Sequence, residues 1–263
     1  MLLAVDVGNS TVVISFIKNN KITAHDRSLT DSSEIEINYT EKINNIMKSN
    51  GIFSTDINGA IISSVVPLMT DVLQKAIINS IGIMPLIVNS KLHYDFSIAV
   101  KNPEALGSDR IADAAAGLYE YGAPLIIADM GTATTISVID NNRAFIGGLI
   151  LPGVRTAMNA LIHNTAQLPQ IKLPKYMDTI IGKDTVSSIQ NGIVYGNAAC
   201  LDGLFDRISN ELGYEPKIIA TGGNMSAIIP FCRHKVITDK YLLTKGLSLI
   251  FNQNKEAYIN AQR

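Results

Sequence analysis

The chain opens with an apolar run, Leu2 to Val5, that ends at Asp6 and leads through a glycine turn into a β-branched run. The pair Asn19-Asn20 closes this second run, and asparagine tolerates the positive φ that tight turns require. Apolar runs of this length, bounded by turn residues, are typical of β-strands. The N-terminal segment therefore predicts strand, glycine turn, strand, asparagine turn and strand.

The same pattern recurs in the middle of the chain. An apolar run from Leu125 to Ala128 precedes a second aspartate, and a second asparagine pair follows at 141–142. An Asp-x-Gly-x-x-Thr spacing is shared by the two copies, at Asp6, Gly8 and Thr11 and at Asp129, Gly131 and Thr134. The distance between the copies is much longer than the about 20–50 residues of solenoid repeats. We therefore expect the duplication of a whole domain.

The segments after the two copies also correspond, because each holds an apolar strand candidate followed by apolar residues at helical spacing. The predicted strands are 57–62 and 217–220, and the predicted helices run from Pro67 to about Ile81 and from about Met225. Two further helices are predicted over 108–121, with Ser108 as a candidate N-cap, and over about 186–212. These elements predict an α/β protein with an N-terminal domain at 1–118 and a C-terminal domain at 119–263.

Composition narrows the class of protein. Hydrophobic residues make up 47% and charged residues 17% of the chain, which excludes a disordered or fibrous protein. The net charge of −1 lacks the positive excess of a general nucleic-acid binder. Two cysteines are too few for a disulfide framework or a thiolate metal cage. Because the start lacks a cationic signal region and no apolar run suits a membrane helix, we expect a cytoplasmic protein that binds neither nucleic acid nor membrane.

A strand-ending aspartate followed by a glycine turn and hydroxyl groups suits phosphate binding when it occurs twice. Glycine lets backbone N–H groups approach phosphate oxygens, and the aspartates can hold the cation that accompanies a polyphosphate. A single Asp-x-Gly turn is more often ordinary turn chemistry, but its duplication with preserved hydroxyls favours a paired phosphate site. The candidate hydroxyl donors belong to Ser10, Thr11, Thr132, Thr134 and Thr135.

Two further motifs admit two interpretations each. In Gly107-Ser108-Asp109-Arg110, the carboxylate can complement the dipole of a helix start, or it can accept a hydroxyl proton while the guanidinium binds an anionic substrate. The Thr221-Gly222-Gly223 turn lets a flat nucleotide approach the backbone, or it is a plain strand-to-helix loop.

Taken together, the motifs resemble those of the type III pantothenate kinases, a family within the acetate and sugar kinase/Hsp70/actin superfamily. The resemblance covers nearly the whole chain and rests on DVGNST at 6–11, SSVVP at 63–67, NPEALGSDR at 102–110, DMGTATT at 129–135, GGLILPG at 147–153 and TGG at 221–223. It implies two duplicated actin-like, ribonuclease H-like domains with a cleft between them. It also implies ATP-dependent phosphorylation of pantothenate to 4'-phosphopantothenate, the first step of coenzyme A biosynthesis.

The resemblance also implies roles for individual residues. The first phosphate loop would comprise Asp6, Gly8, Asn9, Ser10 and Thr11, and the second Gly131, Thr132 and Thr134, with Gly222 and Gly223 at the adenosine. Asp109 would be the general base, and the pantothenate site would be lined by Val100, Gly107, Ser108, Asp109 and Arg110, with Thr185 reaching it from the partner subunit of a homodimer. Asp129 would lie at a potassium or ammonium ion, and Asp6 at Mg²⁺.

Two other functions stay open at this stage. A regulatory relative could keep the fold and act on transcription through a partner, although such a protein would not need the intact Gly-x-Asp-Arg segment at 107–110 and both Asp-x-Gly turns. Another small-molecule kinase of the superfamily could act on a sugar or a carboxylate. Substrate preference distinguishes this kinase from a pantothenate kinase.

Overall fold

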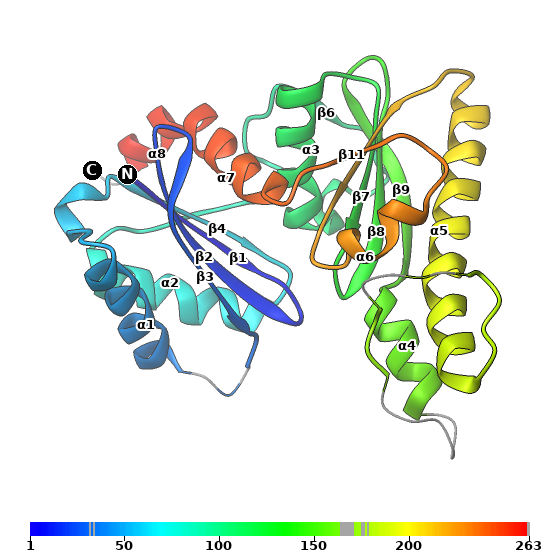
Figure 1. Cartoon of the computed structure of the whole chain (residues 1–263). Coiled ribbons are helices and arrows are strands. Elements are labelled where there is room, and N and C mark those ends of the chain that lie inside the picture. Colours follow the sequence, from blue (N-terminus) through cyan, green and yellow to red (C-terminus); the bar gives the residue numbers. More distant parts are fainter. Residues whose placement is uncertain (32, 34, 164–170, 175–176, 178, 262–263) are drawn as a thin grey trace. The chain divides into compact units, whose positions relative to one another are not determined.

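The computed structural model describes residues 1–31, 33, 35–163, 171–174, 177 and 179–261. The chain forms two compact units, one from Met1–Ala116 with Leu242–Arg263 and the other from Gly117–Tyr241 (Figure 1). None of the described helices combines the length and the hydropathy needed to cross a membrane.

The first unit is built on a five-stranded sheet in the order β3-β2-β1-β4-β5. Strand β1 pairs antiparallel with β2 and parallel with β4. The strands are β1 (Leu2–Val7), β2 (Thr11–Lys18), β3 (Lys21–Leu29), β4 (Gly59–Ser64) and β5 (Leu86–Ile87). The helices are α1 (Glu36–Ser49), α2 (Pro67–Ile81), α7 (Leu242–Gln253) and α8 (Lys255–Ala261), and the short strand β6 spans Ser97–Ile98.

Alternation along β1 sends its side chains to two separate cores. Leu3, Val5 and Val7 pack with residues of α1 and α2. On the opposite face, Leu2 and Ala4 pack with residues of α7 and of the start of α3 (Ser108–Tyr121). Asp6 belongs to this second face by alternation, so the α3 and α7 side of the sheet carries the first candidate aspartate.

The second unit repeats the plan of the first. Its strands β9, β8, β7, β10 and β11 lie in that order, with β7 antiparallel to β8 and parallel to β10, as β1 is to β2 and β4. The strands are β7 (Leu125–Met130), β8 (Ala133–Ile139), β9 (Ala144–Pro152), β10 (Lys217–Thr221) and β11 (Val236–Thr238), and the helices are α4 (Val154–His163), α5 (Thr185–Leu212) and α6 (Met225–Ile228). In Figure 1, the long α5 runs along one side of this sheet and α4 lies below the ends of the strands. Helix α5 packs on Ile126, Ala128 and Met130.

The two units share one strand order and the same strand directions, which confirms the predicted duplication and the α/β class. The expected division of the chain, however, needs revision at its C-terminal end. Helices α7 and α8 belong to the first unit, because Leu247, Ile250 and Phe251 pack on the β1 and β4 face. A Cβ on Gly59 would collide with the Phe251 ring, which shows how closely α7 lies on this sheet.

Of three local predictions, the first is confirmed and the other two are only partly right. The first asparagine turn has φ of 51° and 59° at Asn19 and Asn20, as predicted. In the second hairpin the positive φ falls on Arg143, because the Asp140 carboxylate accepts the backbone N–H groups of Asn142 and Ala144 and fixes the turn. The helix predicted from Met225 is a single short turn, α6.

Candidate active site

The first glycine loop, residues 8–11, closes the β1–β2 hairpin. The Gly8 N–H donates to the Thr11 carbonyl at 2.9 Å, which makes a tight two-residue turn of Asn9 and Ser10, both exposed. The Thr11 hydroxyl accepts a hydrogen bond from Arg27 Nη2 at 3.2 Å. Asp6, the last residue but one of β1, is half-buried. This end of the sheet therefore carries the carboxylate and the hydroxyls that the motif predicted.

Ser108 joins the start of α3 to the end of β4. Its hydroxyl lies 3.1 Å from Ser63 Oγ, accepts the Ser64 N–H at 2.9 Å and donates to the Ser64 carbonyl at 3.0 Å. Ser63 is the register partner of Asp6 on β4, so the same interaction brings the start of α3 to the candidate aspartate. The hydroxyl therefore bonds across to the sheet instead of capping its own helix, and Ser108 is buried.

The two residues after Ser108 form a charged pair at the start of α3. Burial raises the pKa of the Asp109 carboxyl above its ordinary value, and the Arg110 N–H bonded to Asp109 Oδ1 at 2.7 Å acts in the opposite direction. Burial lowers the pKa of Arg110, while the charges of Asp109 and Asp113 raise it. A half-buried carboxylate whose pKa is raised accepts a proton more readily than a solvated aspartate does. A Cβ on Gly107 would collide with Asp109 Oδ1.

The second glycine loop, residues 131–133, follows β7 and Asp129. Gly222, at the end of β10, has φ of +88°, and a Cβ at this position would lie 2.6 Å from the Met130 nitrogen and would also collide with Asp129 Oδ1. Glycine at 222 therefore brings the Thr221-Gly222-Gly223 turn directly against the end of β7. The structure thus joins two motifs that are far apart in the sequence.

The two Asp-x-Gly-x-x-Thr copies differ in hairpin register. Asp6 pairs with Val13 across β1 and β2, seven positions further along, whereas Asp129 pairs with Thr135 across β7 and β8, only six positions further. Directly paired residues of an antiparallel sheet share a face, so Thr135 lies on the face of Asp129 and Thr134 lies on the other. Thr134 is 3% exposed, and its hydroxyl makes no hydrogen bond to any described residue.

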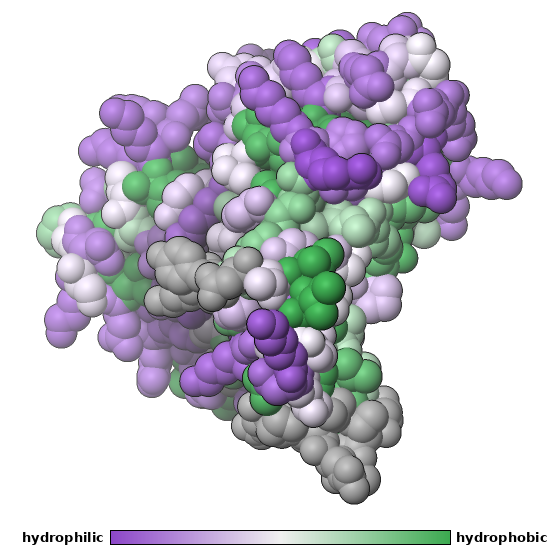
Figure 2. Space-filling view, turned by 45° about the vertical axis from the view of Figure 1, so that its right-hand side comes forward, coloured by the Kyte–Doolittle hydropathy of each residue, from purple (hydrophilic) through white to green (hydrophobic). Residues whose placement is uncertain are grey.

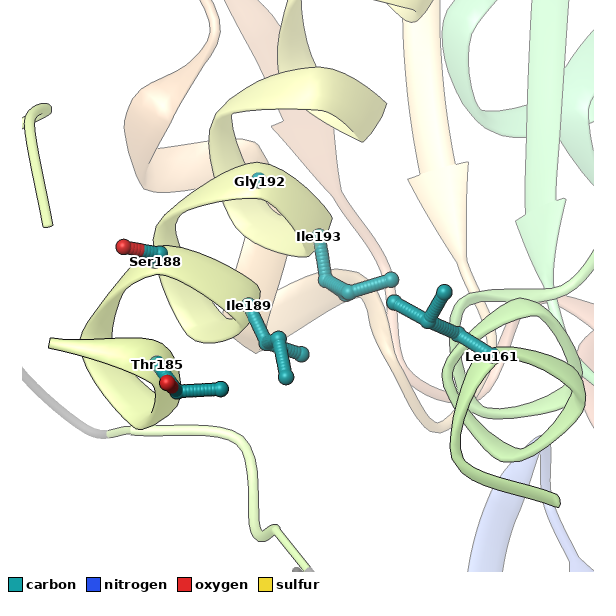
Figure 3. Close-up of a pocket in the computed structure, with 6 residues that line it drawn as sticks. All are labelled: Leu161, Thr185, Ser188, Ile189, Gly192 and Ile193. Carbon is teal, nitrogen blue, oxygen red and sulfur yellow. The ribbon is translucent and has the colours of Figure 1, made fainter. Parts of the chain in front are cut away.

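Two predicted substrate-site residues, Val100 and Thr185, lie outside the glycine loops and the start of α3. Val100 is half-buried after β6, and Thr185 is exposed at the first turn of α5. Thr185 lies at one end of a shallow groove between α4 and α5, where Ile189 and Ile193 point toward Leu161 and the Ser188 hydroxyl points away (Figure 3). Asp184 accepts the Ser187 N–H and hydroxyl, so it caps α5 and its pKa is held below the ordinary value.

No group of three or more His, Cys, Asp or Glu side chains that could hold a metal ion occurs within the described ranges. Asp6 in the first unit and Asp129 in the second are therefore single carboxylates, each near hydroxyl groups of its own glycine loop. Such a set suits a cation that keeps most of its water and is bound largely through a polyphosphate, as Mg²⁺ is with nucleotides. The residues present fit that kind of ion.

A sequence model of the type III pantothenate kinase family matches residues 2–207. The chain belongs to this family. Type III pantothenate kinases are kinases, so membership implies ATP as the phosphoryl donor together with a divalent metal ion. The match includes both glycine loops, the whole of α3 and most of α5.

Solved structures confirm the actin-like fold of this type III pantothenate kinase family member. One is assigned to the Baf family of transcriptional activators from Campylobacter jejuni, with 20% identity, 97% of this chain and 99% of that chain covered, and a TM-score of 0.57. Another is component A of (R)-2-hydroxyglutaryl-CoA dehydratase from Acidaminococcus fermentans, with 12% identity, 100% and 99% covered, and a TM-score of 0.58. A third, assigned as an N-acetylglucosamine kinase from Porphyromonas gingivalis, has 13% identity, 97% and 100% covered, and a TM-score of 0.54.

Proposed function

We propose that this protein phosphorylates the primary hydroxyl of pantothenate with ATP and so produces 4'-phosphopantothenate for coenzyme A biosynthesis. The observation that carries the proposal is the charged pair at the start of α3. Asp109 is half-buried with a raised pKa, and Arg110 follows it directly. The Ser108 contacts to β4 fix this helix start on the sheet that bears Asp6.

In the proposed reaction, Asp109 orients the pantothenate hydroxyl and accepts its proton. The hydroxyl oxygen then bonds to the γ-phosphorus of ATP, the bond from that phosphorus to the bridging oxygen breaks, and ADP leaves with the electron pair. Arg110 binds the pantothenate carboxylate, and Val100 and Gly107 line the same pocket. A guanidinium matches the carboxylate geometry with two parallel hydrogen bonds, which selects for an acidic substrate over a neutral sugar.

The nucleotide contacts follow from the two loops. Around the tight turn at Gly8, the backbone N–H groups of Asn9 and Thr11 and the hydroxyls of Ser10 and Thr11 would bind phosphate oxygens. The N–H groups of Gly131 and Thr132 and the Thr132 hydroxyl would do the same. The turn at Gly222 and Gly223 would receive the adenosine. Phosphoryl transfer depends mainly on such positioning and on charge neutralisation. Thr135, which shares the face of Asp129, is a better placed hydroxyl than Thr134.

Two cations have candidate carboxylates. Asp6 would hold Mg²⁺ through water, and Mg²⁺ would neutralise the charge that develops on the transferred phosphoryl group. Asp129 would hold a potassium or ammonium ion beside the nucleotide phosphates. Its carboxylate lies close to Gly222, where a Cβ would collide with Asp129 Oδ1.

A homodimer completes the proposal. The second unit exposes apolar side chains just before α5, with Ile180 64% and Ile181 75% exposed. Gly192 and Gly196, which lie along α5, have open space beside them. The side of Figure 1 that carries α5 comes forward in Figure 2, where near-neutral and apolar residues lie among strongly hydrophilic ones. A second copy would cover this face and bring Thr185 to the partner's substrate pocket.

The deciding experiment measures ADP release with pantothenate, with a hexose and with neither, in the presence of ATP and Mg²⁺. We expect release that depends on pantothenate, with one 4'-phosphopantothenate formed per ADP, detected by mass spectrometry. Release that depends on the hexose would assign the protein to another kinase class. The absence of any substrate-dependent release would favour a regulatory relative.

A further inference from the structure

The carbonyl oxygens at the second glycine loop are held by a side chain outside the Asp-x-Gly motif. Asn224 is 8% exposed, and its Nδ2 donates to the carbonyl oxygens of Met130 and Gly131, both at 3.1 Å. Arg155 Nε donates to Asn224 Oδ1 at 3.1 Å. Because the oxygen end of the amide faces a guanidinium, the NH₂ end is the one directed at the loop.

The next carbonyl along the loop is held from the same side. Thr132 O accepts the Thr156 hydroxyl at 2.7 Å and the Gly153 N–H at 3.1 Å. Thr156 lies one residue after Arg155, so the two sets of hydrogen bonds are joined through α4. A planar trans peptide directs its N–H opposite to its carbonyl. With three successive carbonyls directed toward Asn224 and α4, the N–H groups of residues 131–133 are directed away from them, an arrangement that suits an anion.

The first glycine loop is held in a related way by a threonine at the end of β3. Thr30 donates its hydroxyl to the Gly8 carbonyl at 2.7 Å and its N–H to the Ser10 carbonyl at 3.0 Å. By the same peptide geometry, the N–H groups of Asn9 and Thr11 are directed away from Thr30. In both units, then, a threonine hydroxyl and a backbone N–H fix the carbonyls of the glycine loop.

We propose that Asn224, Thr156 and Thr30 are positioning residues for the nucleotide. They hold the peptide planes of the two glycine loops so that N–H groups face the phosphate oxygens. The inference rests on the proposed function for the identity of the anion, a nucleotide phosphate. A carbonyl oxygen turned toward a phosphate would repel it. When each carbonyl is already held before the ligand binds, that repulsion is avoided. The loop then loses less conformational entropy on binding.

The test removes each donor with little change of shape. Thr30→Val and Thr156→Val delete one hydroxyl each, and Asn224→Asp replaces the NH₂ group by an oxygen that faces two carbonyls. Thr30→Ser and Thr156→Ser keep the donor. The matched control is Thr23→Val, which deletes another threonine-to-carbonyl hydrogen bond, from Thr23 to Phe16 at 3.0 Å, at the far end of the β2–β3 hairpin. Titration calorimetry gives the Kd for ADP with Mg²⁺, and thermal unfolding follows stability.

We expect each Thr→Val variant to bind ADP about tenfold more weakly, as for the loss of one well-placed hydrogen bond, and Asn224→Asp to bind it more weakly still. The serine variants and Thr23→Val should stay within about twofold of the wild type. In turnover, KM for ATP should rise while KM for pantothenate does not, which a general loss of stability would not produce. If Asn224→Asp fails to fold, the ADP Kd values of the two valine variants still test the positioning role.

An ADP Kd within about twofold of the wild type in both folded valine variants would overturn the positioning role. So would an equal loss in Thr23→Val. A wild-type protein that binds ADP but does not phosphorylate pantothenate would reject the proposed function, and the comparison of ADP affinities would still test the positioning residues.

Discussion

The Ser108 hydroxyl lies 3.1 Å from the Ser63 hydroxyl and bonds both the N–H and the carbonyl of Ser64. Through this pair, the N-terminal turn of α3 is joined to the end of β4, next to the strand that carries Asp6. The charged residues that follow Ser108 therefore take their position from the sheet. In this geometry Ser108 attaches the helix start that carries the proposed general base, and the substrate contact expected of Ser108 stays a prediction.

Ser108→Ala tests that attachment. The change leaves the half-buried Ser64 N–H without its partner, and an unsatisfied group of this kind costs about 1–3 kcal/mol. We expect the free energy of unfolding in urea to fall by that amount, with kcat reduced because Asp109 is less well held. Ser49→Ala, which removes an exposed hydroxyl bonded to its own helix, is the control and should change little. Unchanged stability with a raised KM for pantothenate would instead show a substrate contact.

Asp109→Asn separates catalysis from stability. Asparagine keeps the shape and the oxygen that accepts the Arg110 N–H, but it cannot accept the hydroxyl proton, so turnover should fall at least about 100-fold. Turnover within a few-fold of the wild type would leave Asp109 with a structural role only. In the wild type, kcat/KM should fall with decreasing pH as Asp109 is protonated, at a higher pH than for an ordinary aspartate.

The same variant should be more stable than the wild type at neutral pH. Because the folded-state pKa of Asp109 is raised, the stability of the wild type is greatest below the unfolded pKa and falls as pH rises through the folded pKa. Asparagine does not titrate and avoids this loss. Thermal unfolding from pH about 4 to about 8 should show a difference in Tm that grows with pH. A difference that does not vary with pH would contradict the assignment.

Gly222→Ala tests the contact between the Thr221-Gly222-Gly223 turn and β7. A Cβ there adds a collision with Asp129 and Met130 to the strain of φ +88°. Gly213→Ala is a matched control in the same unit, because Gly213 has φ +75° and open space around its Cβ position. We expect the control to lose about 1–2 kcal/mol from backbone strain alone. Gly222→Ala should lose more and should also bind ADP poorly, whereas equal losses in the two variants would argue against the contact.

The proposed cation at Asp129 predicts a requirement for potassium or ammonium in addition to Mg²⁺. A preset group of oxygen ligands favours the larger ion, so sodium should substitute poorly. Initial rates in potassium, ammonium and sodium buffers of equal ionic strength measure this directly. Asp129→Asn should lower the potassium-dependent rate. Equal rates in sodium and potassium would remove the cation from the proposal.

Local chemistry predicted much of the fold, although one helix with a clear local pattern was missed. The helices over 67–81 and 108–121 occur as predicted, since Pro67 and a polar start mark their first turns. The helix α1 was missed, although Tyr39, Ile43 and Met47 give it an apolar stripe at a spacing of four.

The candidate site, too, could be predicted from the sequence only in part. The repeated Asp-x-Gly-x-x-Thr spacing correctly indicated a duplicated hairpin, but it could not give the pairing register, which depends on turn geometry and moves a side chain to the other face when it shifts by one residue. Thr134 and Thr135 exchange faces for this reason. Asn224 and Thr30 were missed because they lie outside the motifs and reach the loops only through the tertiary fold.

The last prediction concerns the shared site of the proposed homodimer. If Thr185 of one subunit completes the pocket that contains the partner's Asp109, each site is built from both chains. Asp109→Asn inactivates a site by removing the base, and Thr185→Arg does so by filling the pocket with a long cation. Each variant is inactive alone. In a mixed dimer, one site collects both substitutions, whereas the other has a native aspartate and a native threonine.

Mixing the two variants and allowing the subunits to exchange should therefore restore activity. Random exchange of equal amounts makes about half of the dimers mixed, each with one working site of two, so the rate should approach roughly a quarter of the wild type. Light scattering and mass spectrometry verify the dimer and the exchange. If both residues served the same chain's pocket, every site would keep one lesion, and mixing would restore nothing. Absence of recovery after verified exchange would reject the shared site, but it would leave the kinase assignment intact.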